Sequence, residues 1–279
     1  MRELSVFFKY SGGIICSLFT THRTMKIITL NANGIRASQR KGMFEWFKKQ
    51  DADVLCIQET KAQLDQLDPS LFIPQGYHFY QADAVKKGYS GVSIYSKNQP
   101  EAVKYGIGWD LFDNEGRWLQ VDLGHLIVVS LYLPSGSAKE ERQDFKYMCM
   151  ERLEAVLQEL KNTGKPFVVC GDWNIAHKKI DIKNWRGNQK NSGFLPEERE
   201  WMTKLFDEYG LIDAFREVEP REEQFSWWSN RGQAWANNTG WRLDYHITSP
   251  CLKDNVKTAS IYKEERFSDH APVIIEYDL

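Results

Sequence analysis

The sequence has 279 residues, of which 42% are hydrophobic and 27% charged, and its net charge at pH 7 is −2. This composition excludes a wholly disordered chain, a collagen-like fibre and a coiled coil. The length allows one large domain or two small ones, and no apolar run approaches the roughly 20 residues of a membrane-spanning helix. The five cysteines contain no CxxC pair, which argues against a disulfide framework and a structural zinc site. We therefore expect a soluble protein of a reducing compartment, the cytoplasm (nucleoid-associated if bacterial).

The first 24 residues differ from the rest of the chain. They contain one short apolar run, residues 13–19, between Lys9 and His22–Arg23. A secretory signal has a longer apolar region, followed by small residues at its cleavage site. We expect residues 1–24 to be an N-terminal extension outside the fold, with a targeting segment as the alternative, and residues 25–279 to form the folded domain.

Short apolar runs rich in β-branched residues recur along the chain and predict strands. In chain order they are residues 26–30, 54–57, 91–95, 118–123, 126–131, 167–170 and 272–275. Most of these runs lack polar alternation, which is typical of strands buried on both faces. The fourth run does alternate, with Trp118, Gln120 and Asp122 on one face, and this pattern predicts a half-buried strand.

Helical spacing is clearest over residues 139–162, and Gly164 and Pro166 mark the end of that helix. The apolar residues that share one face of it are Phe145, Cys149, Leu153, Val156 and Leu160. Weaker patterns predict helices over residues 39–50 and 196–209. Because the chain has no linker, low-complexity tract or repeat, we predict one α/β domain with mixed sheets covered by helices.

Two loops in the second half of the chain are basic and aromatic, although the total charge is near zero. Residues 177–190 carry five basic residues against one acid, and residues 224–243 carry two arginines, four tryptophans and no acid. Such loops suit a nucleic-acid surface, because cations can contact phosphates and rings can stack on bases or sugars. The alternative is that the tryptophans fill the core.

Polar residues follow the apolar runs where the strands are expected to end. They are Asn31, Asn33, Glu59, Tyr132, Asp172, Asn174, Asp244, Asp269 and His270. Singly, each has a structural explanation: Asn33 can form a turn, and Asp172 can end a strand as a turn residue. Similarly, Glu59 can cap a helix and His270 can be a buried, hydrogen-bonded side chain. Together they are an oxygen-rich set without thiols, which favours Mg²⁺ or Mn²⁺ over zinc.

Seven short strings occur in a characteristic order. They are LNANGIR (30–36), CIQETK (56–61), GYSGV (88–92), LYLP (131–134), GDWN (171–174), WRLDY (241–245) and SDHAP (268–272). From residue 25 to the C-terminus the chain thereby resembles the exonuclease III family of AP endonucleases. The resemblance implies a four-layer α/β sandwich of two packed mixed β-sheets flanked by helices. It also implies Mg²⁺-dependent hydrolysis of DNA phosphodiesters 5′ to abasic sites, with Mn²⁺ as a substitute, together with 3′-to-5′ exonuclease and 3′-end-trimming activity.

The same resemblance implies roles for the polar residues. The metal ligands would be Asn31, Glu59 and Asp269, joined in some assignments by Asp172, Asn174 and His270. The catalytic residues would be Tyr132, Asp172, Asn174, Asp244 and His270. Asp172 would orient and deprotonate the attacking water, with Asn174 beside it. His270, oriented by Asp244, would contact the scissile phosphate, and Tyr132 would donate to the phosphate or to the leaving oxygen.

Binding to DNA would involve a further group of residues. By resemblance they are Tyr89, Arg117, Arg186, Asn188, Asn191, Trp227 and Trp241. The tyrosine and Arg117 would hold backbone phosphates, the asparagines would line the phosphate track and the abasic pocket, and the tryptophans would wall a flipped-out sugar. An abasic nucleotide has no stacking to lose, so such a pocket favours it. The expected partner is double-stranded DNA with abasic sites or blocked 3′ ends, bound by a monomer.

Three positions depart from the family pattern. Asn33 stands where some members have aspartate, Ser135 replaces a longer amide, and the loop at Arg231 and Gly232 does not fix the balance between activities. One alternative is therefore a 3′-phosphatase or 3′-exonuclease with little AP endonuclease activity. A second is an enzyme of the same scaffold that acts on inositol phosphates or sphingomyelin. A third, a non-enzymatic binding module, would be expected to have lost catalytic positions that are present here.

Overall fold

The computed structural model describes residues 24–279, so the extension expected over residues 1–24 lies outside the described residues except for its last position. Thr24 is already the first residue of a strand, one residue before the expected start of the domain. Within the described part of the chain, no helix is long and apolar enough to cross a membrane.

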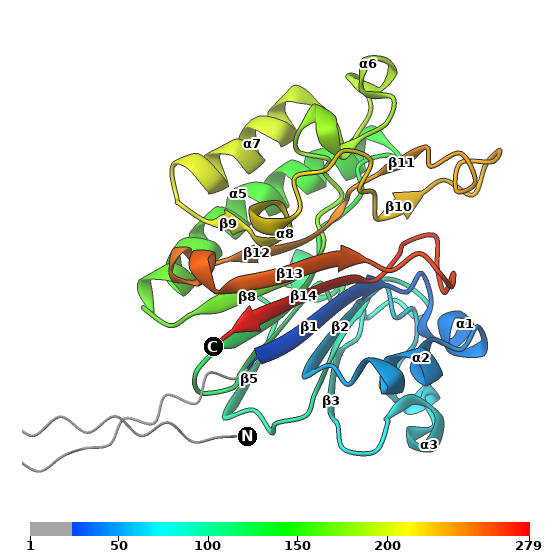
Figure 1. Ribbon diagram of the computed structural model, residues 1–279, viewed down its shortest axis with the longest axis vertical. Helices are drawn as coiled ribbons and strands as arrows, with labels where there is room; N and C mark the ends of the chain where they lie inside the picture. Colours follow the sequence, from blue (N-terminus) through cyan, green and yellow to red (C-terminus); the bar gives the residue numbers. More distant parts are fainter. Residues whose placement is uncertain (1–23) are drawn as a thin grey trace, which may run out of the picture.

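Two six-stranded sheets pack face to face at the centre of the molecule (Figure 1). Sheet A contains β1 (Thr24–Asn31), β2 (Val54–Gln58), β3 (His78–Ala82), β4 (Val92–Ser96), β13 (Val256–Ile261) and β14 (Val273–Asp278). Sheet B contains β5 (Ala102–Tyr105), β6 (Trp118–Asp122), β7 (Ile127–Tyr132), β8 (Phe167–Asp172), β9 (Ile212–Asp213) and β12 (Asp244–Thr248). The strand orders are β13-β14-β1-β2-β4-β3 and β5-β6-β7-β8-β12-β9. A separate two-stranded ribbon pairs β10 (Trp227–Trp228) with β11 (Gly240–Trp241).

Helices cover the outer face of each sheet and complete the four layers (Figure 1). Sheet A packs against α1 (Ile35–Arg40), α2 (Met43–Gln50) and α3 (Pro69–Phe72), and sheet B against α5 (Glu140–Asn162) and α7 (Pro196–Asp207). The short helices α4 (Asp110–Asp113), α6 (Trp185–Asn188) and α8 (Ala214–Val218) lie in the connections. Every residue of β2 and of β8 is buried, as expected for strands covered on both faces.

The predicted helices are largely present, with one difference. The prediction over residues 139–162 is confirmed by α5, and α7 ends two residues before the predicted end at Tyr209. The single helix predicted over residues 39–50 is wrong, because α1 and α2 are separate helices. Gly42 lies between them with a φ of 86°, a left-handed conformation that favours glycine and interrupts a right-handed helix.

The alternation in β6 also has an exception. Trp118 is buried, whereas Gln120 and Asp122 on the same face are half-buried. The tryptophan packs in the layer between sheet B and α5, with Phe145 among its cluster. The outer face of this strand is therefore covered at its N-terminal end, which the alternation alone does not reveal.

Strand direction brings the predicted site residues to one edge. β1 and β2 are parallel neighbours in sheet A, so Asn31 lies opposite Gln58 at their C-terminal ends. β7 and β8 are parallel neighbours in sheet B, with Tyr132 opposite Asp172. β12 runs antiparallel to β8, and its first residue, Asp244, therefore also lies opposite Asp172.

A polar bridge joins the two sheets beneath this edge. Gln58 of β2 donates its Nε2 to Ser130 Oγ of β7 over 2.9 Å. Thr29 Oγ1 donates to Gln58 Oε1 over 3.2 Å, and Ser130 Oγ donates to the Ile57 carbonyl over 3.2 Å. All four residues are buried. Because unpaired polar groups are costly in a core, this closed set of hydrogen bonds fixes how the sheets meet.

Candidate active site

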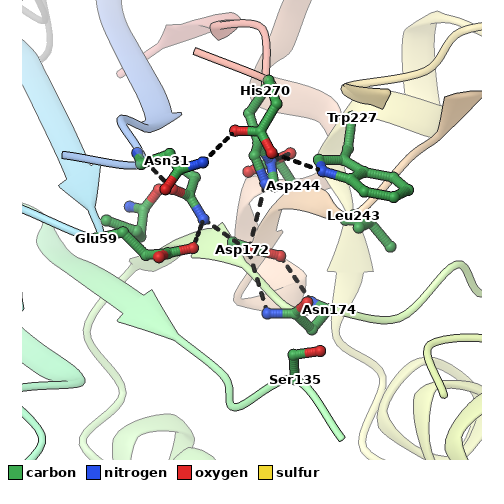
Figure 2. Close-up of polar contacts among 12 residues, drawn as sticks. Asn31, Glu59, Ser135, Asp172, Asn174, Trp227, Leu243, Asp244 and His270 are labelled. Carbon is green, nitrogen blue, oxygen red and sulfur yellow. Dashed lines mark hydrogen bonds and ion pairs between the residues drawn. The ribbon is translucent and has the colours of Figure 1, made fainter. Parts of the chain in front are cut away.

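The buried amide of Asn31 connects carboxylates that come from the two sheets. Its Nδ2 donates to Glu59 Oε1 over 2.8 Å and to Asp172 Oδ2 over 2.9 Å (Figure 2). Glu59 directly follows β2 of sheet A, whereas Asp172 ends β8 of sheet B. Polar residues that the sequence places after strands of different sheets therefore meet here, joined by the Asn31 side chain.

Asn174 holds the Asp172 carboxylate from the other side. Its backbone N–H donates to Asp172 Oδ1 over 2.8 Å, and its Nδ2 donates to Asp172 Oδ2 over 3.1 Å and to the Leu133 carbonyl over 2.8 Å. Burial raises the pKa of Asp172, and Asp244 raises it further, to about 7, although His270 opposes the rise. A carboxyl group with such a pKa can accept a proton near neutral pH.

Asp244 and His270 form a second buried unit beside Asp172. His270 Nδ1 lies 2.8 Å from Asp244 Oδ2, and the Ser226 hydroxyl donates to the same oxygen over 2.6 Å. The other ring nitrogen, Nε2, lies 3.8 Å from Asp172 Oδ2. Burial alone would lower the pKa of His270, but Asp244 and Asp172 raise it to about 10. The imidazole is therefore protonated at neutral pH and can donate from Nε2.

A chain of polar contacts links Glu59 to Asp269. Lys61 Nζ lies 2.6 Å from Glu59 Oε2 and donates to Asn33 Oδ1 over 2.5 Å. Asn33 Nδ2 in turn donates to Asp269 Oδ1 over 2.9 Å. Trp227 Nε1 donates to the other oxygen of Asp269 over 3.2 Å. Asn33 thus supplies an amide that both accepts from Lys61 and orients Asp269.

The oxygen donors of this site fit a divalent cation. Burial opposes ionisation of Glu59, but Lys61 and Asn31 lower its pKa below the ordinary value. Burial is likewise outweighed at Asp269, mainly by His270, and the pKa there is also lowered. Both carboxylates line the same cleft as Asp172, and ionised oxygen ligands suit Mg²⁺ or Mn²⁺.

Another group has metal-like spacing. Within residues 24–279, ligand atoms of Asp172, Asp244 and His270 lie within 4.8 Å of one another. In that group, however, Asp244 and His270 already bind each other. We therefore favour the Glu59 and Asp269 side for the cation.

Arg117 lies beneath Tyr132 and is only 1% exposed. Its guanidinium lies 4.5 Å from the Tyr132 ring centre, donates to the Tyr132 carbonyl, and pairs with Glu115 over 2.6 Å. It also donates to the Tyr89 hydroxyl, as does Arg142. The Arg117 guanidinium is therefore covered by Glu115 and the two tyrosines, and the phosphate contact expected for it stays a prediction.

A cleft of about 1080 Å³ opens above the buried centre. Asp172 and His270 line it together with Trp227 and Trp241, whose rings are nearly perpendicular with centres 6.1 Å apart. These tryptophans are half-buried neighbours on the β10–β11 ribbon. The cleft therefore brings four of the five predicted catalytic residues (Tyr132, Asp172, Asn174 and His270) together with the two tryptophans.

The remaining predicted binding residues divide into two groups. Asn188 and Asn191 line the cleft, and so does Ser135, which Figure 2 places beside Asn174. Tyr89 and Arg186 are not among the residues that line it. Arg186 is exposed on α6 and stacks on Trp185 at 4.5 Å from the ring centre.

The sequence profile of the Endonuclease/Exonuclease/phosphatase family matches residues 28–270. The chain belongs to this family. An exodeoxyribonuclease of Bacillus subtilis is 43% identical over 251 residues, which cover 89% of this chain and 98% of the relative. The DNA repair nuclease APEX1 of Danio rerio is 39% identical over 90% of this chain and 81% of its own.

Solved structures of the endonuclease/exonuclease/phosphatase type share the fold. An AP endonuclease from Archaeoglobus fulgidus has a TM-score of 0.84 and 28% identity, covering 91% of this chain and 100% of its own. The 3′-phosphatase NExo from Neisseria, bound to a product DNA hairpin, has a TM-score of 0.83 and 25% identity over 91% and 100% of the two chains. These findings confirm the resemblance, the four-layer sandwich and the enzyme class, a nuclease, expected from the sequence.

Four residues of this family member's site were missed from the sequence. Lys61 stands in the QETK string, so its signal was present although its contact with Glu59 was not foreseen. Ser226, which donates to Asp244, lies in a loop without a recognisable signature. Glu115, in the turn between α4 and β6, and Arg142, in α5, belong to the network around Tyr89. Only folding reveals such partners.

Proposed function

We propose that the protein is a DNA repair nuclease that hydrolyses phosphodiesters 5′ to abasic sites and trims 3′ ends of double-stranded DNA. The observation that carries the proposal is the joining of Asp172 to Glu59 through Asn31, with His270 beside it, at the base of an aromatic cleft. The relatives named as exodeoxyribonuclease and DNA repair nuclease support the same substrate class.

Glu59 and Asp269, with Asn31 beside them, would hold the divalent cation, and we favour Mg²⁺ with Mn²⁺ as a substitute. When bound, the cation supplies positive charge that offsets the charge developing on the phosphate oxygens. The Asn33 amide keeps Asp269 in place. Because asparagine stands where some members of the family have aspartate, this side carries one negative charge fewer.

The chain's own residues would carry the proton transfers. Asp172 would accept a proton from the attacking water, since its pKa of about 7 suits this role. Asn174 keeps the carboxylate oriented through its two hydrogen bonds. The protonated His270 would donate from Nε2 to a phosphate oxygen, while Asp244 holds Nδ1. Tyr132 would donate to the phosphate or the leaving oxygen, and burial together with Glu59 raises its pKa so that it keeps its proton.

The cleft walls support selection of a base-free sugar. Trp227 and Trp241 line the same cleft as His270, and so do Asn188 and Asn191. Flipping a normal nucleotide costs a few kcal/mol of stacking and pairing, a cost that an abasic nucleotide mostly avoids. The half-buried tryptophans would form the wall against which the base-free sugar packs.

A second function, 3′-end repair with little AP endonuclease activity, is favoured by one observation. The fold similarity to the Neisseria 3′-phosphatase, at a TM-score of 0.83, is nearly as high as that to the Archaeoglobus AP endonuclease. Ser135 and Arg231, two of the positions that depart from the family pattern, line the cleft. They are where the balance between the two activities would be set.

A cytoplasmic setting belongs to the proposal too, because Cys56, Cys149, Cys170 and Cys251 are free.

The test uses three labelled duplexes, one with an abasic-site analogue, one intact and one with a 3′-phosphate at a nick. Each is incubated with Mg²⁺ and, separately, with EDTA. We expect rapid incision at the abasic site with Mg²⁺ and none with EDTA. Activity confined to 3′ ends would instead support the second function. Failure to act on any of the duplexes would overturn the assignment to DNA and favour a small phosphoester substrate.

A further inference from the structure

An ion pair without solvent exposure joins the two helices that cover sheet B. Lys146 of α5 and Glu198 of α7 meet at 2.5 Å between Nζ and Oε1, and both side chains are 0% exposed. Charged residues are almost never fully buried unless paired, and a buried pair is often no more stabilising than apolar residues of similar size. Packing of the two helices therefore does not require this ion pair. Its role is indicated by the hydrogen bonds that Lys146 and Glu198 make to other residues.

The lysine end of the pair reaches the catalytic centre. Lys146 Nζ donates to the backbone carbonyl of Asn174 over 2.8 Å. Asn174 has a φ of 52°, in the left-handed region that non-glycine residues rarely adopt. Its N–H and Nδ2 hold the two oxygens of Asp172. Lys146 thus stabilises the backbone conformation from which Asn174 orients Asp172.

The glutamate end reaches the loop that lines the cleft. Glu198 Oε2 accepts hydrogen bonds from the N–H groups of Gly193 and Leu195, over 2.6 and 3.0 Å. Gly193 has a φ of 92°, and a Cβ there would meet the Asn174 carbonyl and the Trp241 ring, each at 3.1 Å. The loop is therefore held closely against both the residue beside Asp172 and one aromatic wall.

We propose that Lys146 and Glu198 are positioning residues that fix the DNA-lining loop, residues 184–193, relative to Asp172. The inference rests on the proposed function of the site. The buried ion pair contacts Asn174, which orients Asp172, at its lysine end and the DNA-lining loop at its glutamate end. A DNA strand bound to the loop is thereby held at a set distance from the Asp172 carboxylate.

The experiment compares Lys146→Met, Glu198→Gln and the double variant with a matched control. Glu154 of α5 and Lys204 of α7 form an ion pair between the same helices at 2.6 Å, but both side chains are partly exposed. The control is the double variant Glu154→Gln/Lys204→Met. The double variant of the buried pair replaces it by neutral side chains of similar size, which keeps the fold accessible if Lys146→Met alone leaves a buried charge.

Steady-state cleavage of the abasic duplex separates the two ends of the pair. We expect Lys146→Met to lower kcat about tenfold or more with little change in KM, because a shift of about 1 Å at reacting groups can lower rates up to about 100-fold. Glu198→Gln should mainly raise KM, and the double variant should show both changes. The control should match the wild type in kcat and KM.

Limited trypsin digestion gives a measurement that does not depend on activity. Arg186 and Lys190 are exposed cleavage sites in the loop. We expect the loop to be cut several-fold faster in Glu198→Gln and in the double variant than in the wild type and the control. A lower melting temperature with wild-type kcat, KM and digestion rate would overturn the proposal. If the wild type itself does not cleave abasic DNA, the proposed function fails, and the digestion rates still decide whether the pair positions the loop.

Discussion

The catalytic centre and the loop 184–193 are held in opposite ways. In the centre, Asn31, Asp172 and His270 are at most 5% exposed, and their hydrogen bonds join residues far apart in sequence. In the loop, Asn188 donates to the Asn184 carbonyl and Asn191 donates to the Asn188 side chain, so these groups bond to near neighbours. Strand ends thus provide fixed geometry for chemistry. The loop backbone is held at its C-terminal end by Glu198, and its exposed side chains are left to make adaptable contacts with a long substrate.

The largest effect is expected for Asp172→Asn, which tests whether the fixed centre carries the chemistry. The substitution keeps the shape but removes the proton acceptor, so single-turnover cleavage of abasic DNA should fall about 100- to 10,000-fold. Binding, measured by fluorescence anisotropy, should change little because the loop and the tryptophans are untouched. Unchanged turnover would remove Asp172 from its proposed role.

His270→Ala should have the next largest effect and should reduce both rate and binding. The protonated imidazole is the donor expected to meet the phosphate, and removal of one such donor lowers rates about 100- to 1,000-fold. Binding should weaken because the buried Asp244 loses its cationic partner and the site becomes more negative. A purely structural histidine would instead give a lower melting temperature with normal activity per folded molecule.

The sequence predicts the fixed centre better than its surroundings, for a physical reason. Glu59 and Asp172 follow apolar runs, so strand prediction alone places them at sheet edges where they can meet. Arg117 is buried against Tyr132 and Glu115, and Arg142 of α5 joins this network through Glu115; the sequence around Arg117 does not indicate that α5 reaches it. Similarly, Lys146 looks like any other charged residue of a helix until α7 is placed over it. The sequence pattern reveals the strands and helices, whereas the side chains that meet between them, such as Lys146 and Glu198, are determined by the tertiary fold.

The segment that leads into the loop is buried at Asp181, although the loop itself is exposed at Arg186. The contrast between a fixed and an exposed region therefore also exists within this part of the chain. Asp181 accepts hydrogen bonds from Arg242 and Arg216, each over 2.8 Å, and Arg242 also pairs with Asp213. Burial alone would raise the pKa of Asp181, but the two arginines lower it from 3.8 to about 2. The stabilisation is therefore present above pH 3.8 and is lost as the pH falls towards 2.

The shift corresponds to about 2 kcal/mol in the free energy of unfolding. Urea unfolding should show the wild type losing about 1.5 kcal/mol more stability than Asp181→Asn between about pH 5 and about pH 2.5, since part of the stabilisation remains until the pH falls below 2. Equal pH dependence in the two proteins would contradict the role of the ion cluster around Asp181.

The smallest effect is expected for Arg186→Ala, at the exposed tip. Arg186 is solvent-exposed and stacks on Trp185, so its removal should cost one phosphate contact and little stability. The slope of log affinity against log salt should become shallower by about 1, with similar weakening for abasic and intact duplexes. The kcat should match that of the wild type. A loss of kcat comparable to that of His270→Ala would mean that the loop takes part in the chemistry.

The hydrogen bond between Gln58 and Ser130 has a consequence for the whole site. Gln58 immediately precedes Glu59, and Ser130 lies two residues before Tyr132, so the bridge crosses the sandwich directly below the catalytic gap. The hydrogen bond sets the spacing between the two sheets at this level. The distance between the catalytic residues of sheet A and those of sheet B is therefore determined inside the core and not at the cleft. A change of side-chain volume at Gln58 or Ser130 would therefore alter the distance between Glu59 and Asp172, although no catalytic residue had been substituted.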